Sequence, residues 1–271
     1  MASSPDGLAE LKQRMRASWM AGDFGEIARR NEREAEGFVS RLGLKAGMKV
    51  LDVACGTGNV SIPAARTGAN VTGLDIAPNL LQQARKRAES EGLKIEFIEG
   101  DAEKLPQETG QIDVVTSMFG AMFAPRPDMV APEFMRVCRA GGLIAMANWT
   151  ARSFVGQSFI ITGRYVPPPP GLPSPLLWGD ESVVAERFGP RARVETTKRE
   201  LIFDFPYSPA ETAAFFKKYL GPTQMAFARL DAAGQKALGE DLTNHWGANN
   251  EGDAHHTVIK SEYLEVHARM T

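Results

Sequence analysis

Residues 49–60 read KVLDVACGTGNV, and this stretch decides the fold of the chain. Its apolar residues Val50, Leu51 and Val53 indicate a buried strand that leads directly into a glycine-containing turn. A helical pattern follows, so the stretch predicts a strand, a turn and a helix N-terminus in succession. Such a unit lets the backbone approach a ligand closely and offers free N–H groups to it.

The residues around this turn indicate the chemistry of the ligand. Ser61 stands where a dinucleotide-binding turn usually carries its third glycine. Asp52, in the strand, would repel a pyrophosphate but suits a positively charged group such as an amino-acid ammonium. S-adenosylmethionine has an ammonium, a sulfonium and a carboxylate for the helix N-terminus, and it has no phosphate. We therefore infer it as the ligand; the alternative is a tight strand–helix turn without a ligand.

The composition of the chain is ordinary. Its 271 residues are 43% hydrophobic, enough for one large domain or a domain with an insertion. The net charge of −2 favours neither nucleic acid nor an anionic membrane as partner. Two cysteines make no disulfide framework, and neither a signal-peptide core nor an apolar run of about 20 residues is found. We expect a soluble protein of the cytoplasm.

Apolar segments alternate with helical ones through the first half of the chain. The predicted strands are residues 48–54, 70–74, 94–99, 111–117 and 143–148. Helices are predicted over 59–67, from Pro78 to the stop at Gly92, and from a start near Pro132. This alternation predicts an α/β, doubly wound parallel sheet with its ligand at the carboxyl ends of the strands.

Acidic residues lie at or just beyond the ends of three successive strands of this pattern. Asp75 ends the second strand, 17 residues after Gly58, where an exposed carboxylate would accept hydrogen bonds from both ribose hydroxyls. Asp101 follows the third strand and would accept one from an adenine amino group, with the Ala102 N–H facing a ring nitrogen. Any single acid at such a place is more often a helix cap, but together with Asp52 the acids favour a pocket.

Four runs between residues 45 and 150 carry a family resemblance: VLDVACGTGNVSIPAARTGANVTGLDIAPNLLQQARKRAE, IEFIEGDAEKLP, IDVVTSMFGAMF and VCRAGGLIAMANWT. They resemble class I S-adenosylmethionine-dependent methyltransferases, and are similar to the small-molecule branch with ubiquinone/menaquinone-biosynthesis C-methyltransferases. Ser117-Met118-Phe119-Gly120 replaces the Asn/Asp-Pro-Pro-Tyr signature, which argues against a DNA adenine methylase. The resemblance implies that the cofactor is bound by Asp52, Ala54, Gly56, Gly58, Asp75, Ile76, Asp101, Ala102 and Ser117. Within that set, Asp52, Gly56 and Gly58 would hold the methionyl end, and Ser117 would lie beside the sulfonium.

The remaining chain completes the predicted fold. Alternation over residues 193–205 and 258–268 indicates two strands, which in this family form an antiparallel pair at the sheet edge. We thus expect a mostly parallel, seven-stranded, Rossmann-like sheet. The predicted domains are an N-terminal helical cap (1–44), a core (45–207 and 251–271) and a helical lid insertion (208–250).

Four residues are candidates for contact with the methyl acceptor. His245 is the candidate base, and Phe119, Trp149 and Trp246 are candidate acceptor contacts in an apolar or aromatic pocket. For each of them, a packing role is the alternative. No Cys/His cluster has metal-ligand spacing, so no metal is predicted.

The leading hypothesis is methyl transfer from S-adenosylmethionine to a small-molecule acceptor by in-line displacement. The alternatives are a methyltransferase that acts on RNA or protein, and a non-catalytic protein that binds S-adenosylmethionine or S-adenosylhomocysteine. A nicotinamide oxidoreductase is more distant, given Asp52 and Ser61. The acceptor, the methylated atom and the oligomeric state stay open.

Overall fold

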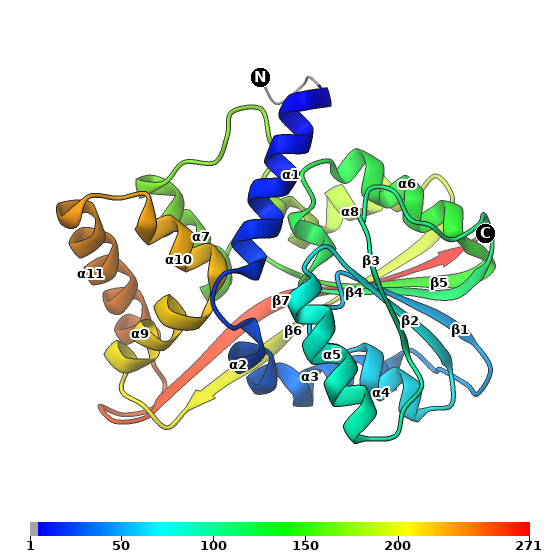
Figure 1. The fold of residues 1–271 in the computed structure, drawn as a ribbon, viewed down its shortest axis with the longest axis horizontal. Coiled ribbons are helices and arrows are strands. Elements are labelled where there is room, and N and C mark those ends of the chain that lie inside the picture. Colours follow the sequence, from blue (N-terminus) through cyan, green and yellow to red (C-terminus); the bar gives the residue numbers. More distant parts are fainter. Residues whose placement is uncertain (1–4) are drawn as a thin grey trace. The chain divides into compact units, whose positions relative to one another are not determined.

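The computed structural model describes residues 5–271, which fall into two compact units (Figure 1). The helical unit comprises the described part of Met1–Arg30 together with Ala151–Leu172 and Glu200–Glu262. The sheet unit comprises Asn31–Thr150, Pro173–Arg199 and Tyr263–Thr271. Two long strands, β6 (Ala192–Phe205) and β7 (Thr257–Met270), contribute residues to both units.

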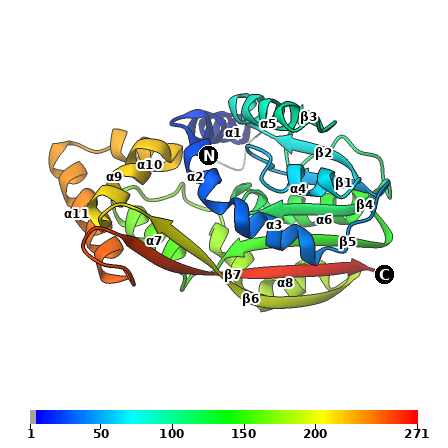
Figure 2. The ribbon, with the colours of Figure 1, turned by 90° about the horizontal axis from the view of Figure 1, so that it is seen from below.

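A seven-stranded sheet has the order β3-β2-β1-β4-β5-β7-β6, which Figure 2 shows from β3 at the top to β6 at the bottom. Its other strands are β1 (Lys49–Val53), β2 (Asn70–Asp75), β3 (Glu96–Glu99), β4 (Ile112–Met118) and β5 (Cys138–Trp149). Strands β1 to β5 pair in parallel, and β7 runs antiparallel to β5. The predicted doubly wound, mostly parallel sheet with seven strands is confirmed.

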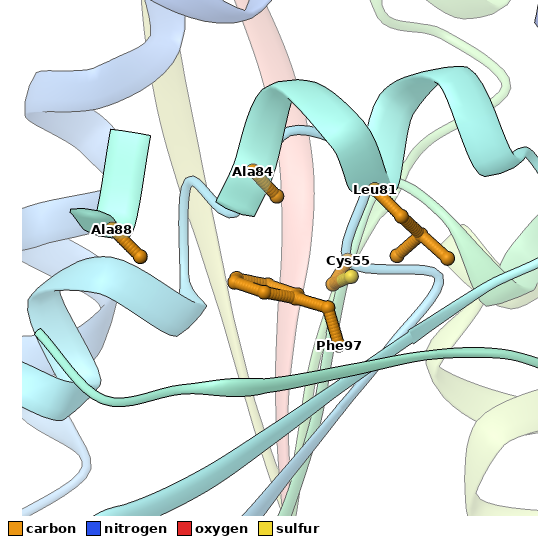
Figure 3. Close-up of a cluster of buried hydrophobic side chains, with 5 residues drawn as sticks. All are labelled: Cys55, Leu81, Ala84, Ala88 and Phe97. Carbon is orange, nitrogen blue, oxygen red and sulfur yellow. The ribbon is translucent and has the colours of Figure 1, made fainter. Parts of the chain in front are cut away.

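Helices of the sheet unit cover the sheet because each presents a stripe of apolar residues. They are α3 (Glu32–Arg41), α4 (Ser61–Arg66), α5 (Pro78–Ser90), α6 (Pro127–Val137) and α8 (Glu181–Phe188), with short 3-10 turns η2 (Ala121–Phe123) and η3 (Pro175–Gly179). Figure 3 shows how α5 directs Leu81 and Ala84 toward Phe97 of β3 and Cys55. A Cβ on Gly73 would lie 2.7 Å from the Phe97 ring, so only glycine leaves room for that ring in the core.

The prediction that a helix starts near Pro132 is wrong. Helix α6 starts at Pro127, which suits the first turn, and Pro132 lies inside it. An internal proline removes one backbone hydrogen bond and costs about 3 kcal/mol. Burial of apolar side chains on both sides of it, among them Val130 and Phe134, offsets that cost.

The helical segment before β1 is broken in the structure. After α1 (Pro5–Met20), the segment 24–41 divides into α2 (Phe24–Ala28), the 3-10 turn η1 (Arg29–Asn31) and α3. Asn31 has φ −102° and ψ 1°, outside the helical region, and the boundary between the units falls directly before it. The α-helix therefore does not run continuously through Asn31.

The helical unit contains α1, α2, α7 (Phe154–Tyr165), α9 (Pro209–Tyr219), α10 (Gly221–Ala228) and α11 (Ala232–Ala248). The insertion between β6 and β7 thus consists of α9, α10 and α11. Ser208 and Glu211 form a capping box that starts α9. None of the helices within residues 5–271 is long and apolar enough to cross a membrane.

Candidate functional site

The turn after β1 has an unusual backbone. Ala54, Gly56 and Gly58 all have positive φ angles, of 56°, 54° and 84°. Glycine adopts this conformation freely, but a residue with a Cβ, such as Ala54, adopts it at a cost. Backbone strain of this kind concentrates at functional sites. The turn is therefore held by its surroundings in a shape that its own residues do not all favour.

Asp52 lies under this turn, almost fully buried. Its carboxylate accepts hydrogen bonds from Ser61 Oγ at 2.6 Å and from Thr116 Oγ1 at 3.2 Å. Burial raises the pKa of Asp52 to about 7, although both hydroxyls lower it. Such a carboxylate is most stable in its charged form when a cation lies nearby, as the ammonium of S-adenosylmethionine would. Ser61, which the sequence analysis noted only because it stands in place of a third glycine, orients this carboxylate.

Asp75 at the end of β2 is buried, and not exposed as expected. Its Oδ2 accepts a hydrogen bond from the Gly56 N–H and its Oδ1 one from the Ala77 N–H, both at 2.8 Å. Burial raises the pKa of Asp75, and these N–H donors only partly oppose the rise. The carboxylate therefore ties the end of β2 to the glycine turn. The Ile76 N–H also donates to this carboxylate, so one lone pair remains with which to accept a ribose hydroxyl.

Asp101 shapes the loop after β3. Its Oδ1 accepts a hydrogen bond from the Glu103 N–H at 2.9 Å, so that Ala102 lies within a tight turn. Glu103 is buried and forms an ion pair with Arg126 at 2.8 Å, and it also accepts the Arg126 N–H. The sequence did not single out this pair, because Arg126 is 23 residues away and only the fold brings the two together.

The end of β4 lies directly against the glycine turn. Ser117 Oγ accepts a hydrogen bond from the Ala121 N–H at 2.9 Å, and Phe119 has a positive φ of 56°. A Cβ on Gly120 would lie 2.6 Å from both Cβ and O of Ala54. The predicted cofactor residues all belong to the sheet unit, at the carboxyl ends of the neighbouring strands β1 to β4: Asp52, Ala54, Gly56, Gly58, Asp75, Ile76, Asp101, Ala102 and Ser117.

Aromatic rings extend this edge toward β5 and β7. Phe119 stacks on Trp149 with ring centroids 3.8 Å apart and an angle of 6° between the planes. The ring of Tyr263 in β7 lies nearly perpendicular to both rings, with centroid distances of 5.3 Å and 6.4 Å. Sequence reasoning named Phe119 and Trp149 but missed Tyr263. Tyr263 lies opposite Trp149 in the antiparallel register, and that pairing is what indicates it.

His245 and Trp246 belong to the helical unit and are described with it. His245 Nε2 lies 2.9 Å from the Phe154 carbonyl oxygen, so this nitrogen is the protonated one. Its ring stacks on Phe154 at 4.3 Å, and Nδ1 lies 3.3 Å from Asn249 Nδ2. Trp246 is buried against Phe216 and other rings. Both side chains thus have packing partners, and their assignment to the acceptor site stays a prediction.

Among the described residues, no group of three or more His, Cys, Asp or Glu side chains is placed to hold a metal ion.

The strand order, the glycine turn and the acids at successive strand ends define the class of Rossmann-like methyltransferases. Residues 50–142 match the family model described as a methyltransferase domain. An uncharacterized protein of Mycobacterium tuberculosis is 40% identical over 215 residues, 78% of each chain. Methyltransferase GfsG of Streptomyces halstedii is 39% identical over 129 residues, 46% of each chain.

Solved structures agree on the fold. The YcgJ protein of Bacillus subtilis superposes with a TM-score of 0.62 at 14% identity, over 88% of this chain and 98% of that one. The chain belongs to the class I S-adenosylmethionine-dependent methyltransferases. S-adenosylmethionine is accordingly its cofactor, and the chemistry of the residues around the glycine turn fits it: a buried carboxylate for a cation, a strained turn, and acids at strand ends.

Proposed function

We propose that this protein transfers the methyl group of S-adenosylmethionine to a small, apolar or aromatic acceptor bound at the carboxyl ends of β4 and β5. The observation that carries the proposal is the stacked pair Phe119 and Trp149 directly beside the glycine turn. Flat apolar rings next to a cofactor site favour an apolar or aromatic ligand over a charged one.

The proposal gives each part of the site a task. The ionised Asp52 binds the ammonium of the cofactor, and the turn 54–58 with the N-terminus of α4 receives its carboxylate. Asp75 with Ile76 binds the ribose, and Asp101 with Ala102 binds the adenine. Ser117 then borders the reacting sulfur.

The cofactor supplies a methyl group that is already activated by a sulfonium. What remains for the chain is to align the acceptor in line with that methyl group and to exclude water. Phe119 does the first by offering a rigid flat surface, because its stack on the buried Trp149 and the perpendicular ring of Tyr263 restrict its motion. For the second we keep the hypothesis that the insertion 208–250, with the N-terminal helices, acts as a lid.

Finer assignments belong to the same proposal. The likeness to quinone-biosynthesis C-methyltransferases makes a carbon atom of a hydrophobic ring one acceptor to test. A location in the cytoplasm stays a prediction that rests on Cys55 and Cys138, both of which are free thiols in the structure.

The test is a transfer assay with methyl-labelled S-adenosylmethionine on fractionated bacterial extract. We expect label in the small-molecule, apolar fraction, and much less label from Asp75→Ala at a cofactor concentration that half-saturates the unaltered protein. Label in RNA or in protein would instead support a methyltransferase that acts on RNA or protein. Tight cofactor binding without transfer in any fraction would leave a non-catalytic binding protein.

A further inference from the structure

We propose that the aromatic cluster of Phe119, Trp149 and Tyr263 distinguishes the charged sulfonium of S-adenosylmethionine from the neutral thioether of S-adenosylhomocysteine. Tyr263, held by Glu34 and Arg41, is the positioning residue of this cluster. The inference rests on the proposed cofactor site at the carboxyl ends of β1 to β4. It gives the cluster a second role besides acceptor binding: to bind S-adenosylmethionine more tightly than S-adenosylhomocysteine, so that the product is released.

Placement is the first support. Strand β4 lies next to β1, on the side away from β2 and β3. With ribose and adenine bound toward β2 and β3, the sulfur of the cofactor faces the end of β4. Gly120 touches the glycine turn at Ala54, so Phe119 is one residue from that contact. The Phe119 N–H donates to the Ala147 carbonyl at 2.8 Å, which fixes this residue in its strained backbone conformation.

Ring geometry is the second support. Trp149 is buried and covers one face of the Phe119 ring, while Phe119 itself is partly exposed. The face of an aromatic ring is electronegative and attracts a cation placed over it. A stack at 3.8 Å keeps the exposed ring from turning its electropositive edge to the ligand. The cluster therefore offers a fixed, electron-rich face to a positive charge.

The anchoring of Tyr263 is the third support. Its hydroxyl donates a hydrogen bond to Glu34 and accepts one from Arg41 Nη2 at 3.1 Å. Arg41 is itself fixed by Glu265, at 2.7 Å from Nη2 and 3.1 Å or less from Nε. Burial and the hydrogen bond to Glu34 raise the pKa of Tyr263. The phenol thus stays protonated and does not act as a base, which leaves its ring as the part that acts on Phe119 and Trp149.

The functional consequence follows from the reaction itself. Methyl transfer removes the positive charge from the cofactor sulfur, so the attraction to the Phe119 face disappears when the reaction is complete. Such an interaction does not by itself speed the chemical step, because it also stabilises the substrate form. It lowers the affinity for the product relative to the cofactor and so favours product release.

The test compares three ligands by calorimetry: S-adenosylmethionine, S-adenosylhomocysteine, and sinefungin, which carries a charged amine in place of the sulfonium. Phe119→Leu removes the ring face, and Phe119→Tyr is the matched control that keeps it. We expect Phe119→Leu to weaken binding of the two cationic ligands by roughly three- to tenfold and that of S-adenosylhomocysteine by less than about twofold. Phe119→Tyr retains the preference, and Tyr263→Phe shows a smaller loss in the same direction.

A second measurement does not depend on how Phe119 variants fold. The fluorescence of Trp149, identified by subtraction with Trp149→Phe, should change when the cationic ligands bind and not when S-adenosylhomocysteine binds. Equal weakening of all three ligands in Phe119→Leu, or equal fluorescence changes, would overturn the inference and leave the cluster a structural role. Failure of the unaltered protein to bind any of the three would instead overturn the proposed function.

Discussion

Gly120 lies so close to Ala54 that a Cβ on it would stand 2.6 Å from both the carbonyl oxygen and the Cβ of Ala54. The contact joins the end of β4 to the strained turn after β1, and the two residues are 66 positions apart in the chain. Any added atom at Gly120 therefore moves the backbone on which cofactor binding depends.

Gly120→Ala tests that contact. We expect a loss of about 1–3 kcal/mol in the free energy of unfolding and at least roughly tenfold weaker cofactor binding, because the turn must shift. Thermal unfolding and calorimetry measure the two effects. Gly163→Ala is the matched control: it lies in α7 with nothing within 4 Å of the new Cβ, and alanine there gains about 1 kcal/mol of helix propensity. A stable Gly120→Ala protein with normal cofactor affinity would contradict the prediction.

The raised pKa of Asp52 leads us to expect opposite effects of pH on stability and on cofactor binding. Its pKa is about 7 in the folded chain against an ordinary value of 3.8, so the folded state keeps a proton that the unfolded state releases. The contribution of this group to stability therefore falls as pH rises from about 4 to about 7. Cofactor affinity should rise over the upper part of that window, because the ammonium needs the ionised carboxylate.

Asp52→Asn separates this group from all others that titrate. We expect the free energy of unfolding of the unaltered protein, measured relative to that of Asp52→Asn, to decrease from pH 5 to pH 7. Over the same range, cofactor affinity should rise in the former only, as measured by calorimetry below the pKa of the ligand's amine, roughly 7.7. Parallel pH profiles in the two proteins would exclude Asp52 as the ammonium partner.

Asp75→Ala should weaken cofactor binding by about 2 kcal/mol, roughly thirtyfold, through a lost charge-assisted hydrogen bond to the ribose. It should also cost about 1–3 kcal/mol of stability, since the Gly56 N–H and the Ala77 N–H lose their acceptor in a buried place. Calorimetry, with folded protein titrated with cofactor to saturation, measures the first effect. The second is read from denaturant unfolding. Glu108→Ala, in the loop before β4 and on the surface, is the control that should change neither.

His245→Gln should behave as a structural substitution. Its Nε2–H donates to the Phe154 carbonyl, and its ring covers Phe154, so we expect a loss of about 1 kcal/mol in stability. Methyl transfer at saturating acceptor should change by less than about threefold. A fall of roughly a hundredfold or more in kcat, with stability preserved, would show that His245 is the general base after all.

Replacing the insertion 208–250 by a short hairpin turn tests the lid hypothesis. The variant also needs polar residues in place of Phe203 and Phe205, which lose the cover of Phe216. We expect methyl transfer to disappear, because water and acceptor are no longer controlled, while cofactor binding weakens only about tenfold, or 1.4 kcal/mol. Full activity in the trimmed protein would end the hypothesis.

Much of the fold could be predicted because it is encoded locally. A buried parallel strand appears as a short apolar run, and the glycine turn after Val53 needs residues that tolerate positive φ. Acids such as Asp75 and Asp101 follow strands by a fixed spacing, so the sheet brings them to one edge whatever the loops do. Strand order and helix cover then follow from a small set of allowed topologies.

Contacts between distant residues could not be predicted, because no local pattern specifies them. The hydroxyl of Ser61 reaches Asp52 only once the turn has folded back over β1, and the start of α6 was decided by burial on both sides of Pro132. Tyr263 meets Glu34 across 229 residues of chain. The sequence by itself determined the class of the protein, its sheet and its cofactor. Only the tertiary structure decided which hydroxyls, charges and rings surround that cofactor, since each such contact depends on where two separate elements come to lie.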